Sequence, residues 1–225
     1  MEELKERLKP VLIVVGLSVV GLLFVVLLGS SGGSKQKVDD GILQTAVSVG
    51  DKARGKLDSK VVVTEFADFQ CPACKTFSPV LQQLFDEYGD RVAFQYRHFP
   101  LLSIHPNANE AARAAQVAAT EGKFWEMHDL LYERQSDWSK VSGSDAGEIF
   151  ADYAEELDIN RDSFVEAYNS EEIIGIVNSE LDQANELRLE GTPTVFVNQK
   201  QSRSLSYQDI KDLIELELSA VSTDE

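Results

Sequence analysis

The sequence predicts an α/β domain with an inserted block of helices, preceded by one N-terminal transmembrane helix. Apolar patterns follow the order strand, helix, strand, several helices, two strands and helix, which favours an α/β domain with a parallel strand pair and a late hairpin. An uncharged, largely apolar run precedes them. The chain has 225 residues, 43% of them hydrophobic and 26% charged, enough for one globular domain with an appendage.

The uncharged run at residues 11–28 predicts the transmembrane helix. As a helix it spans about 27 Å, close to the apolar thickness of a bilayer. It is longer than a core strand (about 4–8 residues) or the apolar part of a signal peptide (about 7–15 residues). A membrane anchor is therefore favoured, although the small residues at 29–31 leave cleavage open.

Charge gives the expected orientation and excludes one class of partner. Lys5, Arg7 and Lys9 precede the run, which slightly favours a cytoplasmic N-terminus. Residues 1–28 are thus expected to form a cytoplasmic stub and anchor. The net charge of −17 lies beyond it, so we expect no nucleic-acid binding and no attraction to anionic lipid.

A flexible linker is expected at residues 29–54, since it opens with the stretch GSSGGSKQ. The β-branched run Val61–Phe66 predicts a buried strand. Apolar residues at helical spacing from Phe77 to Tyr88 predict an amphipathic helix. The alternating stretch Arg91–Phe99 predicts a second strand.

The pattern in the middle of the chain predicts helices, which would form an insertion at about residues 104–189. The run Thr194–Val197 then predicts a strand, and a weaker strand is expected near 202–205. A final amphipathic helix follows. The whole domain is expected at 55–220, with a tail at 221–225.

The motif Cys71-Pro72-Ala73-Cys74 lies between the first predicted strand and its helix. There, Cys71 would face the unpaired N–H groups and the positive end of the helix dipole, which favour the thiolate. Cys71 is therefore the expected nucleophile. Cys74, one helical turn further, is the expected resolving thiol.

Two other interpretations of the two cysteines remain open. The pair could form half of a metal site, but that needs about two further ligands. The candidates are His98, His105 and His128, and none has the spacing of paired ligands. The two thiols could also be incidental.

Four stretches together resemble the DsbA-like thiol–disulfide oxidoreductases: EFADFQCPAC, RHFPL, GKFWEMHDLLY and GTPTVFVN. The resemblance covers about residues 55–220 and is greatest to membrane-anchored forms. It implies a thioredoxin fold with an inserted helical domain. It also implies no metal and no organic cofactor, because the redox group is the Cys71–Cys74 pair.

The resemblance also implies roles for individual residues. Cys71 and Cys74 match the nucleophilic and resolving thiols. Pro193 matches the cis-proline beside them, and the Thr192 peptide group would bind an extended substrate by strand addition. Glu65 matches the buried acid beneath the disulfide, which would accept a proton from Cys74 or tune the redox potential of the pair. Alternatively, Glu65 pairs with a base such as Arg97.

One position departs from the family's strongest oxidants. They have a histidine where this chain has Ala73. Thiolate stabilisation at Cys71 is therefore expected to be weaker and the protein less oxidising.

The function expected from these observations is a dithiol oxidase that introduces disulfides into exported proteins through Cys71 and Cys74. It would be a single-pass protein of the cell membrane, with its catalytic domain extracytoplasmic. Its partners would be exported proteins with free thiols and a quinone-linked membrane redox protein. The alternatives are a thioredoxin-like reductase or isomerase, a tethered binding or chaperone module, and a thiol metal carrier.

Overall fold

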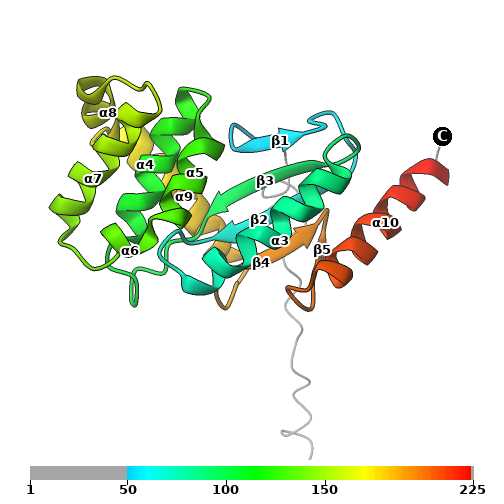
Figure 1. Ribbon diagram of the computed structural model, residues 1–225. Helices are drawn as coiled ribbons and strands as arrows, with labels where there is room; N and C mark the ends of the chain where they lie inside the picture. Colours follow the sequence, from blue (N-terminus) through cyan, green and yellow to red (C-terminus); the bar gives the residue numbers. More distant parts are fainter. Residues whose placement is uncertain (1–49, 224–225) are drawn as a thin grey trace, which may run out of the picture. The chain divides into compact units, whose positions relative to one another are not determined.

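A five-stranded sheet lies at the centre of residues 50–223, the part of the chain that the computed structural model describes (Figure 1). The strand order is β1-β3-β2-β4-β5. The strands are β1 (Ala53–Gly55), β2 (Val62–Ala67), β3 (Ala93–His98), β4 (Thr194–Val197) and β5 (Lys200–Gln201). Strands β2 and β3 are parallel, and the other neighbouring pairs are antiparallel. The predicted parallel pair and late hairpin are therefore confirmed.

Helices cover both faces of the sheet. Helices α3 (Pro72–Tyr88) and α10 (Tyr207–Thr223) share one apolar cluster with β2 and β4. On the other face, α9 (Glu171–Glu186) contributes Ala184 to a cluster with Phe66 and Phe196. Each large apolar side chain buried in these layers stabilises the fold by about 1.5–3 kcal/mol.

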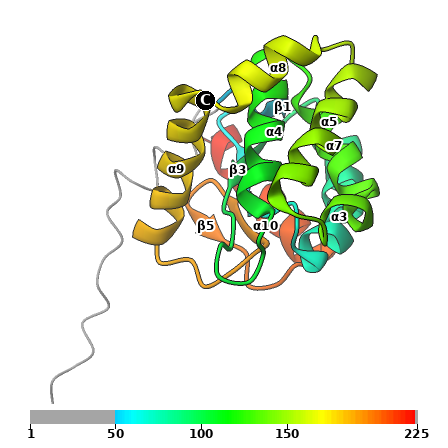
Figure 2. The ribbon, with the colours of Figure 1, turned by 90° about the vertical axis from the view of Figure 1, so that its left-hand side faces the viewer.

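The inserted helices gather beside the carboxyl ends of β2 and β3 (Figures 1 and 2). They are α4 (Ala108–Thr120), α5 (Phe124–Glu133), α6 (Gln135–Trp138), α7 (Gly143–Glu156) and α8 (Arg161–Tyr168). Helix α4 contacts α5, α7, α8 and α9, because its alanines let neighbouring helices approach closely. The apolar cluster of these helices also contains both cysteines.

The predicted linker at 29–54 is wrong at its carboxyl end. Ala53 and Arg54 belong to β1, which pairs with β3, and Lys52 is buried. A strand of three residues is too short to show an alternating pattern. Gly55 has φ +90°, and a Cβ there would lie 2.6 Å from the Val92 carbonyl oxygen, so this edge of the sheet requires glycine.

Smaller differences lie elsewhere. The weaker strand expected near 202–205 is found at Lys200–Gln201, because Asn198 has φ 52° and turns the chain directly after β4. Helix α10 continues to Thr223, into the expected tail at 221–225. The short helix α6 was not predicted.

The expected membrane anchor, residues 11–28, lies outside the described residues, as does most of the linker. Within residues 50–223, no helix is both long enough and apolar enough to span a bilayer.

Candidate active site

The two cysteines lie where β2 leads into α3. Cys71 directly precedes the helix, with Pro72 as its first residue, the position at which a missing N–H costs nothing. Cys71 retains 6% of its surface exposed and Cys74 none. Both are free thiols. Of the two cysteines, only Cys71 therefore retains any exposed surface.

The environment of Cys71 favours its thiolate. The pKa of the Cys71 thiol is lowered to about 5, and the hydrogen bond from the Cys74 thiol is the largest cause. Burial opposes this shift, while Thr192 and the backbone N–H groups of Ala73 and Cys74 add to it. At neutral pH Cys71 is consequently ionised and nucleophilic.

Cys74 has the opposite character. Burial raises the pKa of Cys74 far above its usual value, and its hydrogen bond to Cys71 and the nearby Glu65 carboxylate raise it further. The reduced pair therefore consists of a thiolate at Cys71 and a thiol at Cys74. For Cys74 to attack a sulfur, a nearby base must first take its proton.

Glu65 is buried in the middle of β2, with 3% of its surface exposed. Burial raises the pKa of Glu65 to about 8, against the effect of the Arg54 guanidinium, and Cys71 raises it further. Its Oε1 atom has no hydrogen-bond partner among the described residues. The base whose charge acts on Glu65 is Arg54, whereas Arg97 donates to Glu180 Oε1 at 2.8 Å.

A second loop meets the cysteines from the opposite end of the sequence. The Thr192–Pro193 peptide bond is cis, as the resemblance implied. In its protonated form, the Cys71 thiol donates to the Thr192 carbonyl oxygen at 3.5 Å. The residues expected to bind substrate therefore lie beside the nucleophilic sulfur.

A buried aspartate holds the loop before Cys71, and the sequence analysis did not find it. The Asp68 carboxylate accepts the N–H groups of Gln70 (2.7 Å) and Leu101 (2.9 Å), and Nδ1 of His105 lies 2.7 Å from it. An aspartate whose side chain accepts the backbone N–H group two residues later is a common local turn motif, so this contact has a signal in the sequence. The contacts to Leu101 and His105 are long-range and have no such signal.

The inserted helices fix the same loop from the other side. The Gln135 side chain donates to the carbonyl oxygens of Phe69 (2.7 Å) and Cys71 (3.2 Å). The Asn107 N–H group donates to the Gln70 side chain at 2.7 Å. The inserted helices thus hold the loop that positions the cysteines.

Aromatic rings close the space around Cys74. Phe69 stacks on Tyr96, with ring centroids 4.8 Å apart, and Tyr132 lies 5.1 Å from Phe69. His128 packs edge-on against the Tyr132 ring at 4.9 Å. These rings shield Cys74 from solvent.

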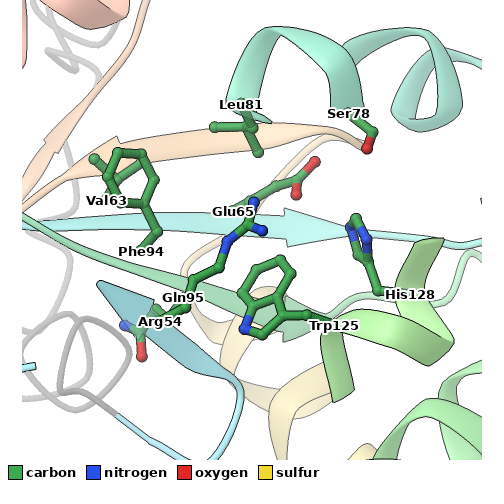
Figure 3. Close-up of a pocket in the computed structure, with 9 residues that line it drawn as sticks. All are labelled: Arg54, Val63, Glu65, Ser78, Leu81, Phe94, Gln95, Trp125 and His128. Atoms are coloured by element: carbon green, nitrogen blue, oxygen red, sulfur yellow. The ribbon is translucent and has the colours of Figure 1, made fainter. Parts of the chain in front are cut away.

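A small cavity lies beneath the site, on the Glu65 side (Figure 3). Its volume of about 10 Å³ suits a single water molecule. Its lining residues are Arg54, Val63, Glu65, Ser78, Leu81, Phe94, Gln95, Trp125 and His128.

The histidines considered as metal ligands have other contacts. His98 lies 3.3 Å from Gln116, His105 contacts Asp68, and His128 Nδ1 lies 2.8 Å from Asp129. Within residues 50–223, no three His, Cys, Asp or Glu side chains are grouped so that they could hold a metal ion.

Comparison with known families decides the identity of this fold. A family model described as thioredoxin matches residues 48–216. The chain belongs to the thioredoxin family. This thioredoxin domain contains all the predicted site residues: Cys71, Cys74, Glu65, Thr192 and Pro193.

Among curated proteins, the thioredoxin domain is similar to segments of much longer chains. It is 38% identical over 162 residues to the Na(+)/H(+) antiporter NhaA 3 of Salinispora tropica, covering 71% of this chain and 24% of that protein. The match to NhaA 1 of Mycolicibacterium vanbaalenii is 34% over 156 residues, covering 66% and 23%. The chain spans about a quarter of the length of these relatives.

Several solved structures align with this chain over most of the length of each. BdbD from Bacillus subtilis, in its oxidised form, has a TM-score of 0.64 and 29% identity, covering 75% of this chain and 92% of BdbD. Wolbachia pipientis alpha-DsbA1 has a TM-score of 0.67 and 19% identity, covering 77% and 94%. The expected DsbA-like fold is confirmed. By fold and by active-site geometry, the described domain is a thiol–disulfide oxidoreductase.

Proposed function

We propose that this protein is a dithiol oxidase that introduces disulfides into exported proteins. The observation that carries the proposal is the contrast between the two sulfurs. Cys71 retains some exposed surface and has a pKa of about 5, whereas Cys74 has no exposed surface and a strongly raised pKa. This contrast stabilises the reduced pair, and a stable reduced form makes the disulfide a good oxidant.

In the proposed reaction, a substrate thiolate attacks Cys71 Sγ of the Cys71–Cys74 disulfide. The bond between the two cysteines breaks, and Cys74 leaves as a thiolate that takes up a proton. A second substrate thiolate then attacks the substrate sulfur of the mixed disulfide, so that Cys71 leaves as the stable thiolate. The substrate loses two electrons, and the cysteine pair gains them.

The pKa of about 5 for Cys71 also supports the expected strength of oxidation. It lies between the values of about 7 in thioredoxin and about 3.5 in the strongest oxidants of this fold. Ala73 offers no side-chain cation to Cys71, which is consistent with this intermediate position. We therefore propose an oxidase whose Cys71–Cys74 disulfide is moderately rather than extremely oxidising.

Substrate binding is proposed at the Thr192–Pro193 loop. The Thr192 carbonyl lies 3.5 Å from Cys71 Sγ, so a peptide aligned along it would bring a cysteine to the nucleophile. Pairing through the peptide group is a form of strand addition, which binds many sequences through the main chain alone.

We also propose the setting of this chemistry. Residues 11–28 would anchor the chain in the cell membrane, with the thioredoxin domain extracytoplasmic, where disulfides persist. A membrane protein that passes the two electrons to a quinone would reoxidise the pair. The support is the uncharged apolar run and the acidic body that follows it.

An oxidative refolding assay tests this function. The oxidised protein is mixed with a reduced, unfolded protein of several cysteines, and recovered native activity is measured. We expect accelerated refolding, its loss in Cys71→Ser, and a trapped mixed disulfide on Cys71 in Cys74→Ser. Acceleration that survives in Cys71→Ser would favour a static binding module instead. Acceleration only of disulfide reduction would favour a reductase.

A further inference from the structure

The cavity beneath the cysteines lies between the buried Glu65 carboxyl and the His128 ring. Glu65 and His128 both line it, and its volume of about 10 Å³ admits one water molecule. In Figure 3 the Glu65 carboxylate points toward the side of the cavity where Ser78 and His128 lie. A water in the cavity could donate a hydrogen bond to the Oε1 atom of Glu65, which lacks a hydrogen-bond partner among the described residues.

His128 connects this cavity to solvent by a single hydrogen bond. Its side chain is 5% exposed, and its Nδ1 lies 2.8 Å from the Asp129 carboxylate, whose side chain is 69% exposed. Burial lowers the pKa of His128, with Arg54 adding to the effect against the influence of Asp129. The ring is therefore neutral at pH 7, with one nitrogen donating and the other accepting.

We propose that His128 and Asp129 form the path by which the proton of Cys74 leaves the active site, through Glu65 and the cavity water. The inference rests on the proposed thiol–disulfide exchange. It assigns the two residues a role in moving the proton, while Cys71 and Cys74 carry the electrons.

The step is the closure of the mixed disulfide when the reduced pair is reoxidised. Cys74 Sγ attacks Cys71 Sγ, the Cys71–Cys74 bond forms, and the oxidant's sulfur leaves as a thiolate with the electron pair. The Cys74 proton passes to the Glu65 carboxylate. Beforehand, the Glu65 carboxyl gives its own proton to the water, the water gives one to the acceptor nitrogen of His128, and Nδ1 gives one to Asp129.

Of the other polar groups that line the cavity, Arg54 and Ser78 are the candidates to compete with this path, since the Gln95 amide and the Trp125 indole do not act as acids or bases at physiological pH. Arg54 lies over the Trp125 ring at 3.9 Å, but a guanidinium keeps its protons at physiological pH. The Ser78 hydroxyl is half-buried in α3 and is the remaining alternative. The experiment below therefore includes it.

Several charged and titratable groups face the path and would contribute to its pH dependence. They come from β1, the loop before α3, α3 itself, β3 and α5: Arg54, Cys71, Cys74, Tyr96, His128, Asp129 and Tyr132. The test compares two steps in the same molecule, so that a shared pH effect cancels.

The experiment uses the full reduced chain and glutathione disulfide as the oxidant. Acid quenching and intact mass separate two rates across pH 5.5–8.5: mixed-disulfide formation at Cys71 and closure by Cys74. We expect His128→Gln and Asp129→Asn to slow closure about tenfold near pH 6–7, within the usual range for assisted proton transfer, and to leave formation unchanged. Asp129→Glu should restore closure.

Two matched variants serve as controls. Glu126→Gln removes an exposed carboxylate from the same helix, and Ser78→Ala removes the competing hydroxyl; both should close at the wild-type rate. Because Asp129 is exposed, Asp129→Asn tests the path even if His128→Gln folds poorly. Wild-type closure in Asp129→Asn, or slowing only in Ser78→Ala, overturns the inference. If the wild type forms no disulfide with glutathione, the proposed function fails as well.

Discussion

At the scale of single residues, the site depends on two neighbouring sulfurs having opposite environments. Cys71 lies at a helix start with donors around it, so the pKa of its thiol falls to about 5. Cys74 lies one turn inside, where burial raises the pKa of its thiol. The helical spacing of the motif alone predicts this division of roles. The strength of the contrast also depends on Thr192, which is distant in sequence.

Burial of the Glu65 carboxyl makes the stability of the folded protein depend on pH. Its pKa is raised from 4.5 to about 8 by burial, so the unfolded chain ionises this carboxyl at a lower pH than the folded chain does. Its contribution to stability is complete below about pH 4.5 and is lost as pH rises toward 8. At about 1.4 kcal/mol for each pKa unit, the loss is on the order of 5 kcal/mol.

We therefore predict that Glu65→Gln becomes increasingly stabilising, relative to the wild type, as pH rises from 5 to 8. The amide stays neutral in both states, so the linkage disappears. Urea unfolding at a series of pH values measures this effect. A stability difference independent of pH would show that Glu65 is ionised in the folded protein and would contradict its assigned environment.

At the scale of the elements, a buried ion cluster joins the start of the domain to α9. Lys52 Nζ lies 2.9 Å from Glu180 Oε1 and donates to Gln116 at 2.8 Å. Arg97 donates to Glu180 from β3, and the His98 N–H group donates to Glu180 Oε2 at 2.8 Å. The cluster anchors the segment before β1 against the insertion.

Glu180→Gln is expected to cost about 3–5 kcal/mol, because it leaves Lys52 with less compensation for its buried charge. Thermal or urea unfolding of the purified chain measures the loss. Glu172→Gln, an exposed position on the same helix, serves as the control and should change stability by no more than about 0.5 kcal/mol. Equal effects of the two substitutions would refute the role of the cluster.

The elements also show how far the sequence could be interpreted. Strands β2 and β4 were predicted closely, because each is a short run of mainly β-branched and apolar residues. Strand β1 was missed, since its three residues carry no periodic pattern and gain their structure from pairing with β3. Asp68 and Gln135 were missed because they act through contacts with residues more than 30 positions away.

At the scale of the whole molecule, the inserted helices lie beside the end of the thioredoxin sheet where the cysteines are. Its rings enclose Cys74, and its Gln135 and Asn107 hold the loop before Cys71. An acidic body with a net charge of −17 surrounds this apolar centre. The active site is thus prepared for exchange with thiols by shielding one sulfur and presenting the other.

The equilibrium reduction potential of the Cys71–Cys74 pair distinguishes an oxidase from a reductase. The purified protein is equilibrated in glutathione buffers of graded ratio, and the oxidised fraction is measured by alkylation and mass. A Cys71 thiolate of intermediate stability predicts an oxidising potential of about −180 mV, less oxidising than the value of about −120 mV for the strongest oxidants of this fold. A value near about −270 mV, typical of a reducing thioredoxin, would contradict the oxidase.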